Sequence, residues 1–282
     1  MTAFKRLFRH VRFNRTVTLC AITLVVLTLL SLLAPLLTSH SNVAADFGSR
    51  LLPPTLADGH IFGTDELGRD LFVRTLYGVR VTLFVAVVAS FVSLGVGVLY
   101  GAIAGYVGGR VDGFMMRIVD GLYALPFIFF VILLMVAFGR SMFLIFIAIG
   151  AINWLDMARI VRGQTMSLKQ RGFVDAARLI GVSTSGIILR HITPNLLGVV
   201  FVYTTLAIPQ AILMESFLSF LGLGIQEPQT SLGSLVNAGV DHMGSSSWLL
   251  VIPAIALALI LLCFNFLGDG LRDMADPRGK TG

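Results

Sequence analysis

Charged residues are scarce in this sequence of 282 residues, where Asp, Glu, Lys and Arg together make up only 13%. Soluble globular domains carry about 25% charged residues. Hydrophobic residues reach 56% of the chain. A protein core cannot absorb that excess of apolar side chains, whereas a lipid bilayer can. The composition therefore excludes an ordinary soluble domain and indicates a membrane protein.

Cysteine is nearly absent, and so are the motifs of catalysis and metal binding. Cys20 and Cys263 both lie inside apolar runs, which indicates buried free thiols rather than a disulfide framework. The five histidines are scattered singly, and no HExxH, CxxC or GxSxG pattern occurs. Gly279-Lys280-Thr281 looks like the end of a phosphate-binding loop, but Met274 stands where its first glycine is required. We therefore expect no enzyme activity and no cofactor in this chain.

Nucleic acid is not an expected partner either. The net charge of +6 is spread unevenly, and no basic run is interleaved with aromatic residues. In membrane proteins such charge usually reflects orientation in the bilayer. Lipid is therefore the first partner that the composition predicts.

Six apolar stretches are candidates for spanning helices, which need about 20 mostly apolar residues. The fourth is the shortest, because Asn153, Asp156 and Arg159 close it. We expect an all-α membrane protein whose spans lie near residues 17–37, 81–105, 118–138, 142–158, 196–218 and 248–267.

The distribution of Lys and Arg predicts the orientation of these spans. Sixteen of the 21 lie in the N-terminal segment, the second and fourth connections and the tail. Because Lys and Arg remain on the cytoplasmic side, both termini are expected inside the cell. This divides the chain into a cytoplasmic segment 1–16, a transmembrane domain 17–270 and a cytoplasmic tail 271–282. A cleaved signal peptide is the competing interpretation, but the first apolar run exceeds the usual 7–15 residues.

Two of the connections contain charged pairs. Asp65 and Arg69, and likewise Asp70 and Arg74, have the i,i+4 spacing of helical ion pairs, so residues 63–80 are expected to form an interfacial helix. Its apolar face would comprise Leu67, Leu71, Phe72 and Leu76. In the second connection, Arg117 and Asp120 are expected to form a structural ion pair near the membrane interface.

A polar segment, residues 159–195, separates the fourth and fifth spans. It holds six basic residues against one acid, Asp175. Gly172 precedes a first helical half with Asp175 in its opening turn, where an acid complements the helix dipole, and Gly181 ends that half. A basic helical segment of this kind indicates docking to a partner outside the lipid.

The sequence in this segment resembles a known family. "DAARLIGVSTSGIILRHITPN" is similar to the EAA loop of permease subunits in bacterial binding-protein-dependent ABC importers, with Asp in place of the usual Glu. "GTDELGRDLFVRTLYGVRVTL", "GYVGGRVDGFMMRIVD", "ESFLSFLGLGIQEPQTSLG" and "FNFLGDGLRDMADPR" resemble signatures of the dipeptide, oligopeptide and nickel subgroup. The closest resemblance is to its second, shorter permease subunit.

The resemblance implies a type I importer permease in the bacterial inner membrane, working by alternating access. The implied partners are a second, homologous permease, two ABC ATPase subunits that bind ATP and Mg, and an extracytoplasmic substrate-binding protein. Residues 159–195 would form the coupling loop, whose family positions are Asp175, Ala176, Ala177, Gly181, His191, Pro194 and Asn195. Ala176 and Ala177 would offer a smooth contact surface.

Other functions fit less well. A secondary transporter would carry ionisable residues at the midplane of its spans, whereas Asp120, Asp156 and Glu215 lie near span ends. A channel would show a filter-like sequence, and a membrane enzyme a catalytic cluster. Short peptides are the expected cargo, with nickel, glutathione or another small solute as alternatives.

Overall fold

The computed structural model describes residues 15–38, 40–56, 59–139 and 141–275. Most of the predicted segment 1–16, and residues 276–282 with Lys280, lie outside this range. Within it, every regular element is a helix. The elements are α2 (Arg15–Leu37), η1 (Phe47–Ser49), α3 (Leu71–Val107), α4 (Gly109–Tyr123), α5 (Phe127–Phe138), α6 (Met142–Lys169), α7 (Gly172–Leu179), α8 (Thr184–Gly186), the π-helical η2 (Ile187–Ile192), α9 (Thr193–Phe220), α10 (Leu232–Val240) and α11 (Trp248–Ala275).

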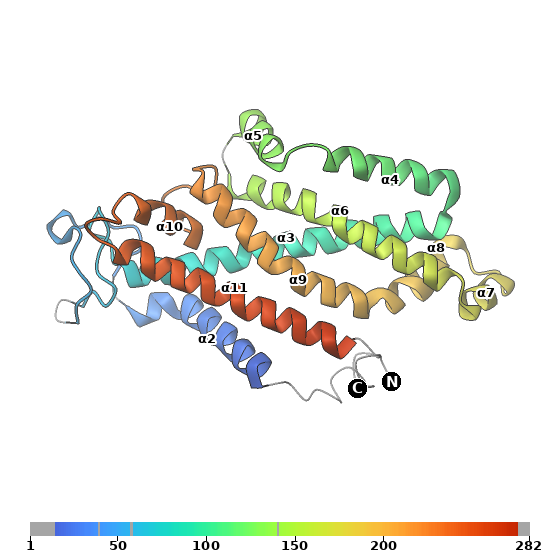
Figure 1. Ribbon diagram of the computed structural model, residues 1–282, viewed down its shortest axis with the longest axis horizontal. Coiled ribbons are helices and arrows are strands. Elements are labelled where there is room, and N and C mark those ends of the chain that lie inside the picture. Colours follow the sequence, from blue (N-terminus) through green and yellow to red (C-terminus); the bar gives the residue numbers. More distant parts are fainter. Residues whose placement is uncertain (1–14, 39, 57–58, 140, 276–282) are drawn as a thin grey trace.

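The long helices form an elongated bundle (Figure 1). α7 and α8 lie at one end, hereafter the α7 end, and α10 lies with the α2–α3 connection at the other, the α10 end. Five helical segments in the described residues are long and apolar enough to cross a membrane. They contain α2, α3, α6, α9 and α11, and a sixth crossing is possible if α4 and α5 count as one span. The all-α prediction is confirmed.

The third predicted span, residues 118–138, is not one straight helix. α4 and α5 are bent by 84° at a short break. Pro126 immediately precedes α5, and the residue before a proline is disfavoured in helical conformation. The proline therefore explains why a continuous apolar run is folded as two helices.

Polar pairs with α6 hold α4 in place. Arg162 donates to both carboxylate oxygens of Asp112, at 2.5 and 2.6 Å. Arg159 donates to Asp120 at 2.6 Å, so the predicted pair between Asp120 and Arg117 is wrong. The prediction failed because α6 continues to Lys169, well past the expected end near residue 158, and carries its arginines alongside α4.

The predicted interfacial helix 63–80 is also wrong. α3 begins at Leu71, where the Asp70 side chain accepts a hydrogen bond from the Val73 amide as N-cap. Residues before it form a loop, and residues after it are the first turns of the spanning helix. Asp70 therefore does not pair with Arg74, because an N-cap side chain folds back over its own helix end.

The most extensive contact between two helices among the described residues is between α3 and α6. Gly97, Gly101 and Gly105 recur every four residues on one face of α3. A Cβ at Gly97 would lie 2.6 Å from the Met157 Cβ, and one at Gly105 would lie 2.6 Å from a backbone oxygen of α6. Small residues at this spacing let two helix backbones approach closely, which is how helices associate inside lipid.

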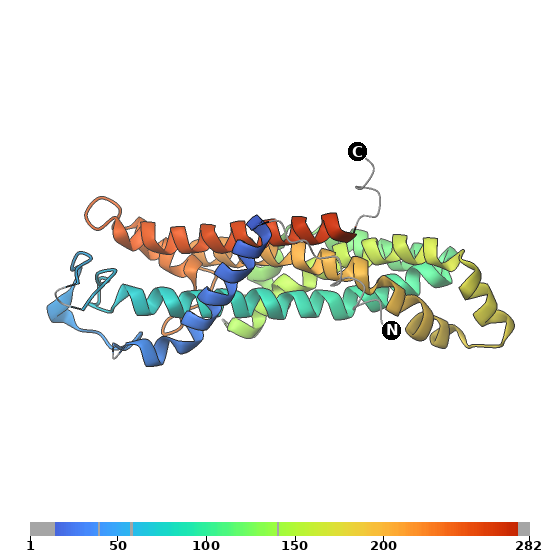
Figure 2. The same cartoon turned by 90° about the horizontal axis from the view of Figure 1, so that it is seen from below.

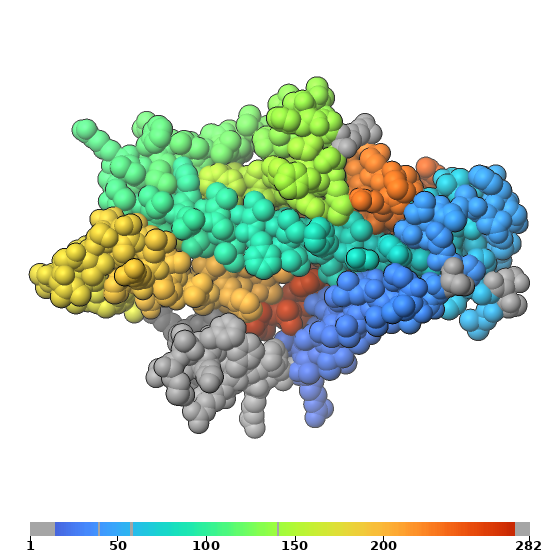
Figure 3. Space-filling model, turned by 180° about the vertical axis from the view of Figure 1, so that it is seen from behind, coloured from blue at the N-terminus to red at the C-terminus, as the bar shows by residue number. Residues whose placement is uncertain are grey.

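Large apolar side chains are exposed along the bundle surface rather than only buried inside. Such residues occur on separate helices, including Leu29, Phe91, Leu133, Leu197 and Leu262. Figure 2 shows α2 crossing α3 obliquely, and Figure 3 shows α3 running between α2 and the α4–α5 pair on one face. Exposed apolar surface on several faces fits a protein surrounded by lipid and further subunits.

Labelling of single cysteines tests the predicted orientation. Ser167 on α6 and Ser245 beyond α10 are both exposed and lie near opposite ends of the bundle. If Lys and Arg remain inside, a membrane-impermeant maleimide added to intact cells labels Ser245→Cys but not Ser167→Cys. Both positions label after the cells are permeabilised, which is the accessibility control. The opposite pattern in intact cells would reverse the orientation.

Candidate coupling loop and charged cluster

At the α7 end, a short helix is anchored to the bundle by one face. Val174 and Ala177 of α7 are buried in an apolar cluster with Tyr106 of α3 and Ile187 and Ile192 of η2. Asp175 lies in the first turn of α7, as predicted, where a negative charge favours the helix dipole. α7 is therefore fixed to α3 and η2 while its opposite face points outward.

Tyr106 of α3 contacts two basic side chains, one on α7 and one at the end of α6. Arg178 donates from Nε to the Tyr106 hydroxyl at 3.2 Å and from Nη1 to Asp175 at 3.1 Å. Lys169 places its ammonium 5.5 Å from the centre of the Tyr106 ring, within the range of a cation–π interaction. The hydrogen bond to Tyr106, and then the nearby charge of Asp175, raises the pKa of Arg178 above its already high ordinary value.

At the C-terminal end of α7, two apolar side chains are largely exposed to solvent. Leu179 is 88% exposed and Ile180 is 79% exposed. Gly181 follows with φ of 78°, and the Val182 amide donates to the Ala177 carbonyl oxygen at 3.0 Å. This is a Schellman helix end, which requires a left-handed residue and so favours glycine. The turn presents an apolar tip, Leu179–Ile180, away from the bundle.

The predicted coupling residues fall into two groups. Asp175, Ala176 and Gly181 are exposed on or beside α7, but Ala177 is buried, so the predicted smooth surface of both alanines is reduced to Ala176. A Cβ on Gly181 would meet no atom within 4 Å. The other positions begin the next long helix, where Pro194 is exposed in the first turn of α9 and the side chain of Asn195 donates to the His191 carbonyl oxygen at 2.6 Å.

The polar segment 159–195 is thus less separate from the spans than expected. Its first residues complete α6, and η2 runs directly into α9. Only residues 170–183, around α7, leave the long helices. α7 therefore lies between two membrane helices and is joined to each by a short connection, residues 170–171 on one side and residues 180–183 with α8 on the other.

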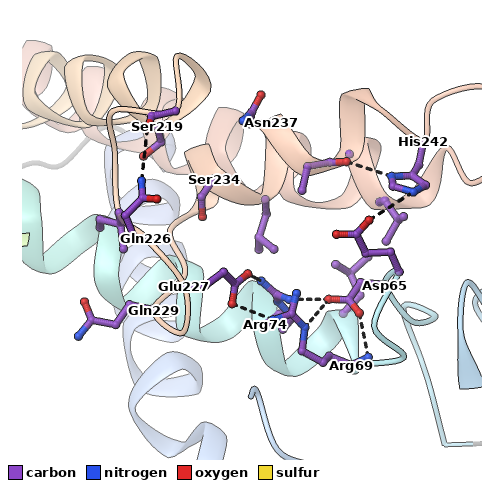
Figure 4. Close-up of a pocket in the computed structure, with 18 residues that line it drawn as sticks. Asp65, Arg69, Arg74, Ser219, Gln226, Glu227, Gln229, Ser234, Asn237 and His242 are labelled. Atoms are coloured by element: carbon purple, nitrogen blue, oxygen red, sulfur yellow. Dashed lines mark hydrogen bonds and ion pairs between the residues drawn. The ribbon is translucent and has the colours of Figure 1, made fainter. Parts of the chain in front are cut away.

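At the α10 end, the structure brings together charges that are far apart in the sequence (Figure 4). Asp65 accepts from Arg69 Nε at 2.7 Å, as the i,i+4 spacing predicted, and also from Arg74 Nη1 at 2.5 Å. Glu227 accepts from Arg69 Nη1 and Arg74 Nη2, each at 2.7 Å. Two arginines therefore lie between two carboxylates, and Arg74 also donates to Thr230 at 3.1 Å.

A second polar network fixes the neighbouring end of α9. Glu215 is completely buried, and its Oε1 accepts from the Ser219 hydroxyl at 2.7 Å. Ser219 lies 3.3 Å from the hydroxyl of Ser231, which caps α10, and the Leu232 amide donates to Thr82 of α3 at 3.1 Å. These bonds tie α9, α10 and α3 into one unit.

One group of described residues has the composition of a metal site. His40, His60 and Asp70 place their ligand atoms within 4.8 Å of one another. Asp70 already caps α3 through Oδ1 and lies 2.8 Å from His60 Nδ1 through Oδ2. We assign this group to fixing the start of α3, because both carboxylate oxygens are already in use.

Comparison with known proteins identifies the family. Residues 97–281 match the model described as "Binding-protein-dependent transport system inner membrane component". The chain belongs to this family. The matched residues include α7 and the start of α9. The family description places the chain in the inner membrane, and its several long apolar helices agree with that location.

Full-length relatives extend the match over the rest of this inner membrane component. The chain is 52% identical to the oligopeptide transport system permease protein OppC of Escherichia coli K12, over 98% of this chain and 90% of that protein. It is 50% identical to OppC of Haemophilus influenzae, over 99% and 88%. It is 44% identical to the dipeptide transport system permease protein DppC of Bacillus subtilis, over 96% and 84%.

The sequence analysis did not identify Glu227 as the partner of Arg69 and Arg74 at the α10 end. The motif "GTDELGRDLFVR" revealed the acids and arginines of the first connection, but not the role of Glu227 in "GIQEPQ". Its one available signal was that Glu227 is the single charged residue between Glu215 and Asp241. Nothing in that stretch indicates a partner 158 residues earlier in the chain.

Proposed function

We propose that this chain is the permease subunit of an ATP-driven importer of short peptides and forms half of its translocation pathway. The names of its relatives support peptides as cargo. The other half comes from a homologous second permease, and an extracytoplasmic binding protein delivers the peptide. Nickel, glutathione and other small solutes are the alternative cargoes that the assay must include.

The observation that carries this proposal is the apolar tip Leu179–Ile180 on the anchored helix α7. An importer driven by ATP must pass movement from separate ATPase subunits to its membrane helices. A short helix that is rigidly attached on one face and apolar at its end is suited to insert in a groove of such a subunit. Because α6 and η2–α9 flank it directly, its displacement would alter the packing of two spans.

In this arrangement the α7 end faces the cytoplasm and the α10 end faces outward. ATP and Mg are bound by the two ATPase subunits and not by this chain. The positions Asp175, Ala176, Ala177, Gly181, His191, Pro194 and Asn195 form or support the coupling surface. Ala177 acts from inside, by holding α7 on the bundle.

Reconstituted transport tests the function. The chain is co-expressed with a homologous second permease and two ABC ATPase subunits from the same organism, purified and placed in liposomes. We expect uptake of a radiolabelled tripeptide only when ATP and the cognate binding protein are both present, and no ATP hydrolysis by this chain alone. Unlabelled tripeptide should compete, whereas nickel and glutathione should not. Uptake of a labelled tripeptide without ATP would contradict the ATP-driven mechanism, and competition by nickel or glutathione alone would replace the peptide cargo.

A further inference from the structure

The two carboxylates of the α10-end cluster are held very differently. Asp65 is buried and accepts hydrogen bonds from the backbone amides of Leu67 and Arg69, each at 2.9 Å, as well as from both arginines. The Glu227 side chain is 56% exposed, and its two oxygens are bonded to the arginines. Asp65 is therefore part of the framework, whereas Glu227 is an external carboxylate placed on it.

The arginines would form a binding site without Glu227. With Glu227 in place, their side chains are only 7% and 4% exposed, so the two guanidinium groups lie largely out of solvent. With Asp65 they carry one net positive charge, and Arg74 Nε is buried with no hydrogen-bond partner. Each guanidinium donates one charge-assisted hydrogen bond to one carboxylate oxygen, so the two arginines together hold both oxygens. Glu227 shows the position that such a carboxylate takes.

The adjoining cavity limits the size of a replacement ligand. It has a volume of about 220 Å³ and is lined by polar side chains that include Gln226, Gln229, Asn237 and His242. Sites for whole small molecules usually measure about 300–1,000 Å³. A cavity below that range suits one amino-acid side chain better than a complete peptide. The exposed carboxylate of Glu227 also places the site on the surface rather than inside the bundle.

We propose that Arg69 and Arg74, supported by Asp65, bind an acidic side chain of the substrate-binding protein, and that Glu227 fills this site when that protein is absent. The inference rests on the proposed function, because it needs a binding protein that docks at the α10 end. Docking would exchange one carboxylate for another without leaving the arginines unpaired. It would also free the 221–231 segment, which leads from the Glu215 network to the cap of α10.

The affinity of the binding protein for the assembled complex in nanodiscs tests the exchange. Glu227→Gln keeps the shape of the side chain but removes its charge. When Glu227 occupies the site, the apparent affinity for the binding protein is the intrinsic affinity multiplied by the fraction of complexes whose site is open. Glu227→Gln should raise that fraction and so bind the binding protein about tenfold more tightly. The gain should disappear in the double variant Arg69→Gln/Glu227→Gln, which lacks one of the two arginines.

Glu66→Gln is the matched control. Glu66 also lines the cavity and its side chain is 53% exposed, but its Oε2 lies 3.7 Å from His242 Nε2 and, among the described residues, its side chain forms no ion pair with Arg69 or Arg74. Its neutralisation removes the same charge and should leave the affinity nearly unchanged, as for an exposed ion pair. An equal gain in Glu66→Gln would mean that only the surface charge matters and would overturn the site.

The remaining outcomes separate this inference from the proposed function. If the wild-type complex binds the binding protein but Glu227→Gln binds no more tightly, Glu227 is a structural clamp and the exchange is wrong. If the Glu227→Gln complex binds trialanine by itself, the site receives cargo and the assignment to the binding protein is wrong. If the wild-type complex binds no binding protein, the proposed function fails as well.

Discussion

Replacing Leu179 and Ile180 together by glutamate is expected to abolish the association of this permease with its ATPase subunits. Both side chains are almost fully exposed at the end of α7, so the substitutions remove no contact within the chain that holds the bundle together. Burying an aliphatic side chain in a partner contributes about 1.5–3 kcal/mol. Loss of two such contacts corresponds to at least about a hundredfold weaker association.

Co-purification measures this effect directly. ATPase subunits recovered with affinity-tagged permease are quantified alongside peptide uptake in liposomes, and both should fall together. Val240→Glu/Met243→Glu is the matched control, since these residues are also apolar and exposed but lie at the α10 end. The control should retain its ATPases. Normal ATPase recovery with the Leu179/Ile180 variant would show that α7 is an ordinary connection.

The second large effect is expected at the α3–α6 contact. A Cβ at Gly101 would overlap the carbonyl oxygen of Ala158, a backbone atom that cannot rotate away. Gly101→Val should therefore separate the two helices. Overpacking of a well-packed core costs about 1–3 kcal/mol, and a clash with backbone lies at or beyond the upper part of that range. We expect little monodisperse protein and a lowered melting temperature.

Gly95→Val provides the comparison within the same helix. Gly95 is exposed, and a Cβ there would meet no atom within 4 Å. The helix propensity and the added volume change in the same way in both variants, so only the contact with α6 differs. Fluorescence-detected size-exclusion chromatography of the two variants should show a clear loss for Gly101→Val alone. Equal profiles would mean that the glycine face does not hold α3 against α6.

The amino-acid sequence determined features that depend on short-range rules. The apolar runs predicted the long helices because about 20 apolar residues suffice to span a bilayer. Likewise, Asp175 lies in the first turn of α7 and Gly181 follows its end, since helix ends are fixed by local backbone conformation and dipole. The resemblance to the EAA loop was recognisable for the same reason, because that signature is contiguous in the sequence.

Only the tertiary structure decided which distant groups meet. Arg74 was expected beside Asp70, but it pairs with Asp65 and with Glu227, 153 residues away. Asp120 was expected beside Arg117 and pairs with Arg159 of α6. In each case the arginine reached a carboxylate on another segment, because the packing of the segments places that carboxylate within hydrogen-bonding distance; Arg74 and Asp65 meet in a buried site, whereas Arg159 and Asp120 meet at the surface. Local spacing fixes where helices begin and end, and packing between them fixes the partners of the charges that they carry.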